Sequence, residues 1–432
     1  MSWKTLYNER RTTAQEAVKL IQSGNRISMS HAAGEPSHLL DAMVANHKAY
    51  RDVEIIHLVP IGKTEYAQPG MENSFRINGL FLGTKTRKTV QDGHGDFTPC
   101  YLSQIPSLWR GALPLDVALI HVSKPDEHGY CSLGVSVDYS KAAVDDAKIV
   151  IAQVNSFMPR TLGDSFVHVS QIDCIVEHDA PLIALPTAEI SDVEKAIGEH
   201  CANLVKDGDC LQLGIGAIPD AALLFMKGKK DLGIHTEMFS DGVVELVNAG
   251  VINNSKKNFN KGKMVACFLM GTQKLYDFVD NNPMVSLHPS SYTNDPYIAG
   301  QNDNLVSINS CVQVDLLGQV CSESVGMTQI SGVGGQVDFV RATAISKGGR
   351  SIIAMPSTAK GGTVSKIVPV LDEGAVVTTN RYDVEYIVTE YGAANLKYRT
   401  AQDRARMLIN IAHPDFRSEL KAAFKARFNT EC

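Results

Sequence analysis

Glu237 stands where α/β enzymes often place a reactive group, between a short apolar run and a new amphipathic stretch. The segment 235–242 reads His-Thr-Glu-Met-Phe-Ser-Asp-Gly, which predicts the end of a strand followed by a helix. A free glutamate has a pKa of about 4.3, so its carboxylate is ionised at neutral pH and can act as a nucleophile without a base. A glutamate chosen at random is more often a solvated surface residue, and Glu245 on the next helical pattern is interpreted that way.

Three glycine-rich loops lie in the same half of the chain as this glutamate. They occupy residues 214–219, 331–339 and 356–365, and each falls between strand and helix patterns or between apolar runs. Glycine permits close approach of a ligand, and exposed backbone N–H groups can bind a phosphate or stabilise an oxyanion. Any one loop could be a mere connection. Three together predict backbone donors around one centre.

The first loop also invites a dinucleotide-binding interpretation. Gly214 and Gly216 follow a strand, and Glu237 lies about 20 residues further on, the spacing expected of a ribose-binding acid. The position of the third glycine holds Pro219, however, and an isolated pair of glycines is a weak signal. A nicotinamide-dependent enzyme therefore remains a minor alternative, and a nucleotide-like ligand such as coenzyme A fits the same loop.

Other residues with reactive side chains carry weaker signals. His235 is expected to be a buried histidine at a strand end, although it could contact the surroundings of the glutamate. Cys321 lacks an assigned histidine partner, and Ser357 lacks a nucleophile elbow, so Ser357 is interpreted as a loop cap or a coenzyme A contact. His121 and His128 show no zinc-binding spacing, and we expect no metal site.

Composition indicates a globular enzyme. The 432 residues suffice for two or three domains, and 44% hydrophobic with 20% charged residues argues against disorder. A net charge of −6 gives no reason to expect nucleic acid or an anionic membrane as a partner. No apolar run approaches the roughly 18 residues of a membrane span. The start lacks a secretory core, and nine scattered cysteines without a CxxC pair suggest reduced, mostly buried thiols in a cytoplasmic protein.

The two halves of the chain repeat one pattern. Thr13 and Ser191 each open a helical stretch with a capping box, and Gly24 and Gly208 are expected to end these helices as left-handed caps. A strand, a small-residue loop containing a proline and another helix follow in both halves. We therefore expect two duplicated α/β domains, residues 1–187 and 188–432.

Apolar, β-branched runs are expected to form the buried strands of sheets covered on both faces. They lie at residues 26–29, 53–59, 117–122, 148–154 and 172–177 in the first half, and at 210–213, 351–355 and 384–389 in the second. The tail from residue 400 to 428 predicts two helices broken at His413-Pro414. The fold class is therefore α/β, with two similar open domains.

Several of these segments together resemble the acetyl-CoA hydrolase/transferase family, in its branch of 4-hydroxybutyrate and butyrate:acetate CoA-transferases. The resemblance covers essentially the whole chain. Its motifs are residues 214–219, 235–242, 334–339 and 365–369, with 125–134 and 155–160 in the first half. Together they are far more specific than any single motif.

The resemblance implies two α/β domains with the active site in the cleft between them. It implies that Glu237 is the covalent glutamate and that Gly361 or Gly362 is the backbone oxyanion donor. The implied coenzyme A contacts are Gly214, Ile215, Gly216, Ala217, Ile218, Gly334 and Gly335. Relatives often carry asparagine at the position of Cys321, so a role of that asparagine in fixing the glutamate would have no counterpart there.

The implied reaction transfers coenzyme A between short-chain carboxylic acids, 4-hydroxybutyrate or butyrate with acetyl-CoA, through a glutamyl-CoA thioester and with ping-pong kinetics. No permanently bound cofactor is expected, since the acyl-CoA is a substrate. Hydrolysis of acyl-CoA by the same glutamate and a non-catalytic coenzyme A-binding module remain alternatives. Met158 and Arg160 could line the carboxylate pocket, although a structural salt bridge of Arg160 is equally compatible. A homodimer is expected.

Overall fold

The computed structural model describes residues 2–186, 189–214 and 216–432, which form two compact units. Unit 1 combines Met1–Pro186 with Val265–Thr293, and unit 2 combines Thr187–Met264 with Asn294–Cys432. Each compact unit thus combines two separate segments of the chain, whereas the sequence predicted two consecutive domains, 1–187 and 188–432. The later segment joins unit 1 through backbone hydrogen bonds: the N–H groups of Val137 and Asp138 both donate to the carbonyl of Cys267 at 3.0 Å.

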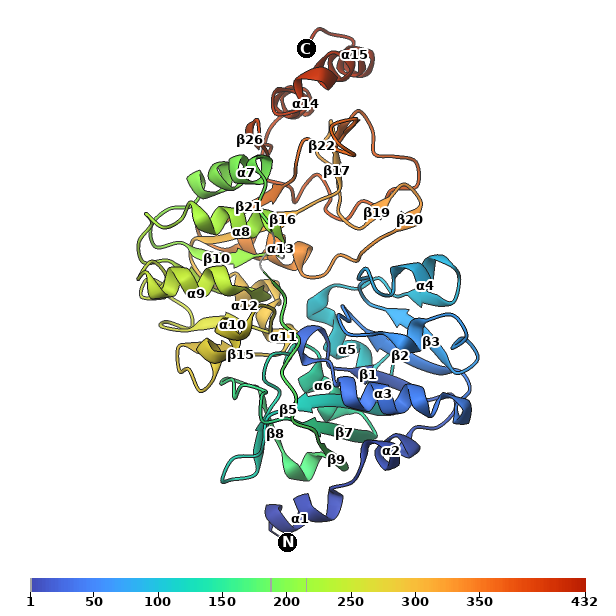
Figure 1. The fold of residues 1–432 in the computed structure, drawn as a ribbon. Helices are drawn as coiled ribbons and strands as arrows, with labels where there is room; N and C mark the ends of the chain where they lie inside the picture. The colour runs from blue at the N-terminus through green and yellow to red at the C-terminus, as the bar shows by residue number, and fades with distance from the viewer. Residues whose placement is uncertain (1, 187–188, 215) are drawn as a thin grey trace. The chain divides into compact units, whose positions relative to one another are not determined.

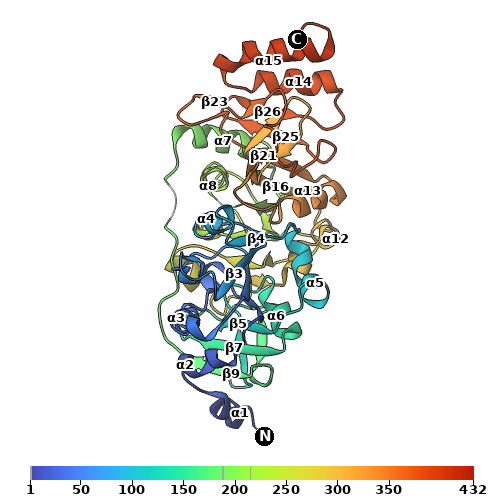
Figure 2. The same ribbon diagram turned by 90° about the vertical axis from the view of Figure 1, so that its right-hand side faces the viewer.

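Unit 1 is built on a parallel sheet of seven strands in the order β4-β3-β2-β1-β5-β7-β9 (Figure 1). Every residue of β2 and of β5 is buried, as expected for strands covered on both faces. The helices α2 and α3 lie on one face and α5 and α6 on the other (Figure 2). The strands are β1 Arg26–Met29, β2 Val53–His57, β3 Phe75–Gly79, β4 Gly95–Phe97, β5 Val117–Val122, β7 Ile149–Val154 and β9 Cys174–Glu177.

The helices of unit 1 are short, and a separate two-stranded sheet pairs β6 (Tyr130–Ser132) with β8 (Phe166–His168). The helices are α1 Trp3–Arg10, α2 Ala14–Ala17, α3 Ser37–Ala45, α4 Arg87–Gln91, α5 Ile105–Arg110, α6 Ser140–Asp146, α10 Gln273–Val279 and α11 Ser290–Thr293. The added segment also contributes the strands β14 Phe268–Leu269 and β15 Val285–Leu287, and β13 Met264–Ala266 spans its first residues and the last residue of the preceding segment of unit 2.

Unit 2 contains a six-stranded sheet in the order β11-β10-β16-β21-β25-β26, in which only β26 runs antiparallel to its neighbour. The strands are β10 Cys210–Leu213, β11 Gly233–Ile234, β16 Leu305–Ser310, β21 Arg350–Ala354, β25 Tyr386–Thr389 and β26 Gly392–Asn395. The helices α7 and α8 cover one face and α13 the other (Figure 2).

The remaining elements of unit 2 are short strands and peripheral helices. The helices are α7 Asp192–Asn203, α8 Ala217–Leu224, α9 Asp241–Asn248, α12 Pro296–Ala299, α13 Gln336–Ile345, α14 Ala401–Asn410 and α15 Arg417–Phe428. The strands are β12 Met238–Phe239, β17 Gln313–Asp315, β18 Val320–Cys321, β19 Ser324–Val325, β20 Thr328–Gln329, β22 Thr358–Ala359, β23 Val364–Ser365 and β24 Ile367–Val368. The predicted pair of C-terminal helices is confirmed.

The duplication predicted from the sequence is visible in strand order. In unit 1 the order β2-β1-β5-β7-β9 matches β11-β10-β16-β21-β25 in unit 2, with the strands parallel in both. The predicted fold class, mixed α/β with two similar open sheets, is confirmed. The placement of an active site in a cleft between the two domains stays a prediction.

The helix starts were predicted more accurately than the helix ends. Ser191 caps α7 in a full capping box with Glu194, and Thr13 caps α2 by accepting from the N–H of Glu16. Gly24 and Gly208 have positive φ of 78° and 81° as expected, but α2 and α7 end several residues earlier. The two glycines therefore form the turns into the next strands.

Seven of the nine cysteines are buried, as expected of small apolar residues. Among the described residues, none of the helices has the length and apolar character needed to cross a bilayer.

Candidate active site

Glu237 is the third residue after the end of β11 and directly precedes β12, on a backbone fixed to the neighbouring strand β10. The N–H of His235 donates to Leu211 O at 3.0 Å. The hydroxyl of Thr236 accepts from the N–H of Leu213 at 3.1 Å and lies 2.9 Å from Met238 O. Thr236 and Met238 are buried, whereas Glu237 is partly exposed. The strand end thus presents one carboxylate from an otherwise buried segment.

Asn294 holds the carboxylate of Glu237. Its Nδ2 donates to Oε2 of Glu237 at 3.0 Å, and the asparagine is fully buried just before α12. The resemblance placed an asparagine of relatives at the position of Cys321 and left its role in this chain open. Cys321 is buried, and its thiol donates to Ser324 O at 3.3 Å. Sequence reasoning missed Asn294, since it lies 57 residues from Glu237 and no motif joins the two.

Gly335 lies against the same carboxylate. A Cβ atom at this position would overlap Oε2 of Glu237 and Nδ2 of Asn294, so only glycine leaves room for both. Gly335 is also the N-cap of the ten-residue helix α13. A helix N-terminus carries partial positive charge and favours an ionised carboxylate beside it. Of the two glycines predicted at this loop, Gly334 supplies the positive φ of 55° that leads into the contact.

Buried polar groups also form hydrogen bonds near the end of β11. His235 is fully buried, and its Nδ1 accepts from Nδ2 of Asn302 at 3.1 Å. This geometry favours the structural interpretation of His235. Lys257 is also buried, and its Nζ donates to Ile234 O at 2.8 Å and to Lys263 O at 2.7 Å. Burial lowers the pKa of Lys257. The two hydrogen bonds of its Nζ tie the strand leading to Glu237 to a following loop.

The loop at 214–218 begins α8, as predicted. The N–H of Gly214 donates to Ile308 O at 2.9 Å, and Gly216, with φ of 115°, is the N-cap of α8 with open space around it. Ala217 and Ile218 form the first turn of the helix, while Ile215 lies outside the described residues.

One contact links this helix to the segment after the glutamate. The hydroxyl of Ser240 donates to Oδ1 of Asp220 at 2.9 Å, so the starts of α8 and α9 are tied together. Burial raises the pKa of Asp220, which the Ser240 hydrogen bond opposes. The first glycine-rich loop and the Glu237 segment are therefore held to one another.

The third glycine-rich loop is the exposed turn of the β22–β23 hairpin. Gly361 and Gly362 have φ of 66° and 90° with open space around both, and the N–H of Gly362 donates to Ala359 O at 3.1 Å. That N–H is therefore already used within the turn. The oxyanion role of either glycine stays a prediction.

Ser357, at the base of the hairpin, is fully buried. Its N–H and its hydroxyl donate to the carboxylate of Glu390 at 2.8 and 2.6 Å. This arrangement corresponds to a loop cap, and a contact of Ser357 with coenzyme A stays a prediction.

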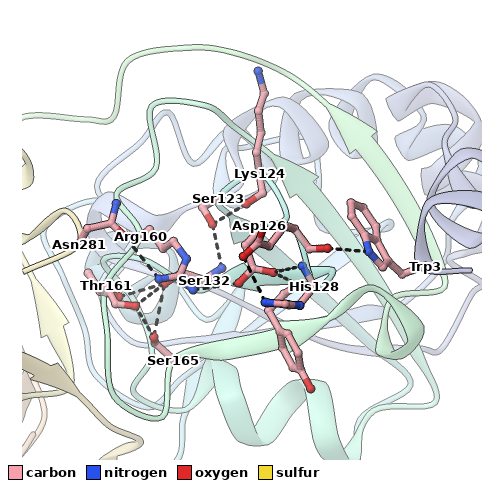
Figure 3. Close-up of polar contacts among 12 residues, drawn as sticks. Trp3, Ser123, Lys124, Asp126, His128, Ser132, Arg160, Thr161, Ser165 and Asn281 are labelled. Carbon is pink, nitrogen blue, oxygen red and sulfur yellow. Dashed lines mark hydrogen bonds and ion pairs between the residues drawn. The ribbon is translucent and has the colours of Figure 1, made fainter. Parts of the chain in front are cut away.

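Arg160 in unit 1 is engaged in structural contacts (Figure 3). Its Nη2 pairs with Oδ2 of Asp126 at 2.9 Å, and its guanidinium stacks 4.6 Å from the ring centroid of Phe166. Nη1 also donates to Asn281 at 3.3 Å. The geometry favours the salt bridge that the sequence left open. Met158 is buried and packs against Gly134.

The two histidines that flank the same motif are neither paired with each other nor part of a metal cluster. Burial lowers the pKa of His121 to about 4, and its Nε2 lies 3.1 Å from Nδ2 of Asn155. His128 is exposed. In the described part of the chain, no group of three or more His, Cys, Asp or Glu side chains could hold a metal ion.

Comparison with known proteins gives matches along the whole chain. The models of the acetyl-CoA hydrolase/transferase N-terminal and C-terminal domains match residues 1–186 and 271–424. A 4-hydroxybutyrate coenzyme A transferase of Clostridium kluyveri is 59% identical over 99% of this chain and 100% of its own. A butyryl-CoA:acetate CoA-transferase of Anaerostipes caccae is 39% identical over 99% of this chain and 98% of its own. The crystal structure of a 4-hydroxybutyrate CoA-transferase from Porphyromonas gingivalis has a TM-score of 0.86 at 42% identity, covering 99% and 100% of the two chains.

Proposed function

Because the chain belongs to the acetyl-CoA hydrolase/transferase family and is a CoA-transferase, we propose that it moves coenzyme A between short-chain carboxylic acids, with 4-hydroxybutyrate or butyrate as the acid and acetyl-CoA as the partner. The observation that carries the mechanism is the position of Glu237. Its carboxylate is partly exposed at a strand end, is bonded to Asn294 and lies beside Gly335 at the start of α13.

The Glu237 carboxylate attacks the thioester carbonyl, which yields a mixed anhydride and the coenzyme A thiolate. The thiolate then attacks the glutamyl carbonyl, so that the first carboxylate leaves and a glutamyl-CoA thioester remains. The acceptor carboxylate reverses both steps. Each half-reaction exchanges one acyl bond for another, and neither a redox partner nor a net proton transfer is needed.

Asn294 and Gly335 supply orientation in this scheme. The amide of Asn294 fixes the carboxylate plane through one hydrogen bond of 3.0 Å. The glycine lets the carboxylate approach the N-terminus of α13, where positive potential favours the anion that must attack. A nucleophile held in this way loses less freedom when the thioester binds. The glycines at 214–216 and 334–335 are proposed to contact coenzyme A, and Gly361 or Gly362 to stabilise the oxyanion.

Replacement of the nucleophile tests the proposal. Glu237→Gln keeps the shape and removes the charge, so the rate of coenzyme A transfer from acetyl-CoA to butyrate should fall about 10⁴-fold or more. Glu245→Gln is the matched control, because Glu245 is an exposed glutamate on α9, eight residues further on. An unchanged rate of transfer in Glu237→Gln would show that Glu237 is not the nucleophile.

Hydrolysis of acyl-CoA is the second candidate, because the matched family models also describe hydrolases. Water would then intercept the glutamyl intermediate in place of the acceptor acid. Incubation of butyryl-CoA with and without acetate separates the two. Transfer predicts acetyl-CoA that forms only with acetate, whereas hydrolysis predicts free coenzyme A at the same rate in both.

The remaining expectations about the protein's setting stay predictions. We propose a cytoplasmic homodimer that holds no permanent cofactor and acts on acyl-CoA and short-chain carboxylates alone, without nucleic acid or membrane. Light scattering coupled to size exclusion would measure the mass of the assembly, and absorbance of the purified protein would reveal a bound chromophore. A change in nicotinamide absorbance during turnover would instead support the dinucleotide alternative.

A further inference from the structure

Unit 2 contains a cavity of about 610 Å³. Glu237, Asn294 and Gly335 do not line it. The β22–β23 hairpin, the strand β24 and the helix α15 contribute to its wall. Most of that wall is apolar, with contributions from Cys311, Val325, Val364, Phe416 and Leu420. The volume lies within the range of pockets that bind small molecules, about 300–1,000 Å³. The cavity is therefore large enough for a short acyl chain and part of its carrier.

Lys366 is one of the residues that line this cavity. Its N–H donates to Ser357 O and its own carbonyl accepts from Val314 N–H, both at 2.9 Å, so the backbone is fixed on both sides. The Nζ atom donates to the carbonyl of Cys311 at 3.1 Å, and both residues line the cavity. The lysine is thus anchored at its base and bonded once at its tip.

The surroundings make the charged form of this amine less favourable than it is in water. An ammonium group carries three donors, and one hydrogen bond joins Nζ of Lys366 to the described residues. Burial lowers the pKa of Lys366, which the Cys311 thiol and Glu390 oppose. A neutral amine keeps one N–H for Cys311 O and leaves a lone pair, which is what a nucleophile needs.

Lys257 provides an internal contrast. Burial also lowers its pKa, but its Nζ donates to two carbonyls, Ile234 O and Lys263 O, and it does not line this cavity. Lys421 on α15 is a second contrast, because it is exposed to solvent. Of these three lysines in unit 2, Lys366 lines the cavity, Lys257 is buried with two hydrogen bonds, and Lys421 is exposed to solvent.

We propose that Lys366 is a site of direct acylation by short-chain acyl-CoA thioesters. The amine nitrogen attacks the thioester carbonyl and forms a C–N bond, the C–S bond breaks, and the departing sulfur takes up the proton that the nitrogen loses. The products are an Nε-acyl-lysine and coenzyme A. The amide is uncharged, so the product leaves no charge at an apolar wall, where burial of charge is costly. The inference rests on the proposed function only for the presence of acyl-CoA, because Glu237 takes no part in the step.

Time-resolved peptide mass spectrometry of the full-length protein tests this inference. Wild type and Glu237→Gln are incubated with acetyl-CoA at neutral pH, and acetylation of each lysine is followed. Lys366 should gain the acetyl group severalfold faster than Lys421 in both proteins, while Lys257 stays unmodified. In 8 M urea, a denaturing concentration for a typical domain, the advantage of Lys366 should disappear. Lys366→Arg should remove its signal and leave that of Lys421 unchanged.

Two outcomes would overturn the inference. Acetylation of Lys366 at or below the rate of Lys421 would show that the cavity confers no reactivity. Acetylation that occurs in wild type but not in Glu237→Gln would show transfer through the glutamate in place of direct attack. Failure of the proposed function looks different, because transfer would then persist in Glu237→Gln whatever happens at Lys366.

Discussion

The two sheets share a strand order, but they carry different side chains at one equivalent place. β2 pairs with β1 through Ile55, and β11 pairs with β10, the equivalent of β1, through Ile234. The third residue after that isoleucine is Leu58 in unit 1 and Glu237 in unit 2. Leu58 is buried, whereas Glu237 is partly exposed and bonded to Asn294. The duplicated fold forms this strand end in both units, and only in unit 2 does the equivalent position carry a carboxylate.

Gly335→Ala tests how far the difference depends on the neighbours of the carboxylate. The φ of Gly335 is −96°, which any residue adopts, so the added Cβ acts by displacing Glu237 and Asn294. We expect kcat/KM to fall about 100-fold, as for a misplacement of about 1 Å. Gly228→Ala is the control, because its Cβ meets no atom within 4 Å. Equal activities of the two variants would contradict the contact.

Asn294→Ala removes the amide that orients the carboxylate and leaves the carboxylate itself. Loss of one preorganised donor costs about 10²–10³ in kcat in a well-studied protease, and we expect the lower end of that range. The reduction should appear in kcat with little change in KM, because Asn294 contacts the nucleophile. Asn248→Ala, at the exposed end of α9, should be silent. A change in KM alone would assign Asn294 to substrate binding.

His57 makes the corresponding end of β2 in unit 1 sensitive to acid. It is fully buried, and burial lowers its pKa to about 4. Between that value and the unfolded pKa of about 6.5, the unfolded chain binds the proton and the folded chain does not, so stability falls as pH falls through this window. The contribution is at most about 3 kcal/mol.

His57→Phe should therefore flatten the loss of stability between pH 7 and pH 4.5, measured by urea denaturation across that range. Activity per folded molecule should be unchanged at pH 7, since His57 lies in unit 1 and the proposed nucleophile Glu237 lies in unit 2. A parallel shift of the whole stability curve would mean that the substitution acts through packing and that His57 does not titrate in this window.

Arg160→Met is expected to have the smallest effect on catalysis. The Arg160–Asp126 pair is partly exposed, with side-chain accessibilities of 31% and 20%, so its loss should cost about 1 kcal/mol of stability. KM for the carboxylic acid should stay the same. A raised KM with an unchanged melting temperature would restore the alternative that Arg160 lines the carboxylate pocket.

The sequence predicts the strands well because their signals are local. β1, β5 and β10 coincide with the predicted runs, since a buried parallel strand needs a continuous apolar segment. The duplication of the α/β unit was also predictable, because the same order of helix, strand, small-residue loop and helix occurs in both halves of the chain. The ends of helices were less predictable: Gly24 and Gly208 mark the turns into the next strands, whereas α2 and α7 end several residues earlier.

The site is only partly predictable, because its contacts are distant in sequence. Glu237 has a recognisable local context, whereas the contacts of Asn294 and Gly335 with it depend on how α12 and α13 pack in unit 2. In the same way, the assignment of Val265–Thr293 to unit 1 depends on backbone hydrogen bonds to Val137 and Asp138, which leave no pattern in the chain.

The proposed transfer depends on a covalent acyl bond at the glutamate of unit 2. Intact and peptide mass spectrometry detects this bond after the protein is mixed with butyryl-CoA without acceptor and then treated with borohydride. We expect one reduced residue, Glu237, in wild type and none in Glu237→Gln. Reduction at a different carboxylate, or rapid transfer with no reducible bond at all, would contradict it.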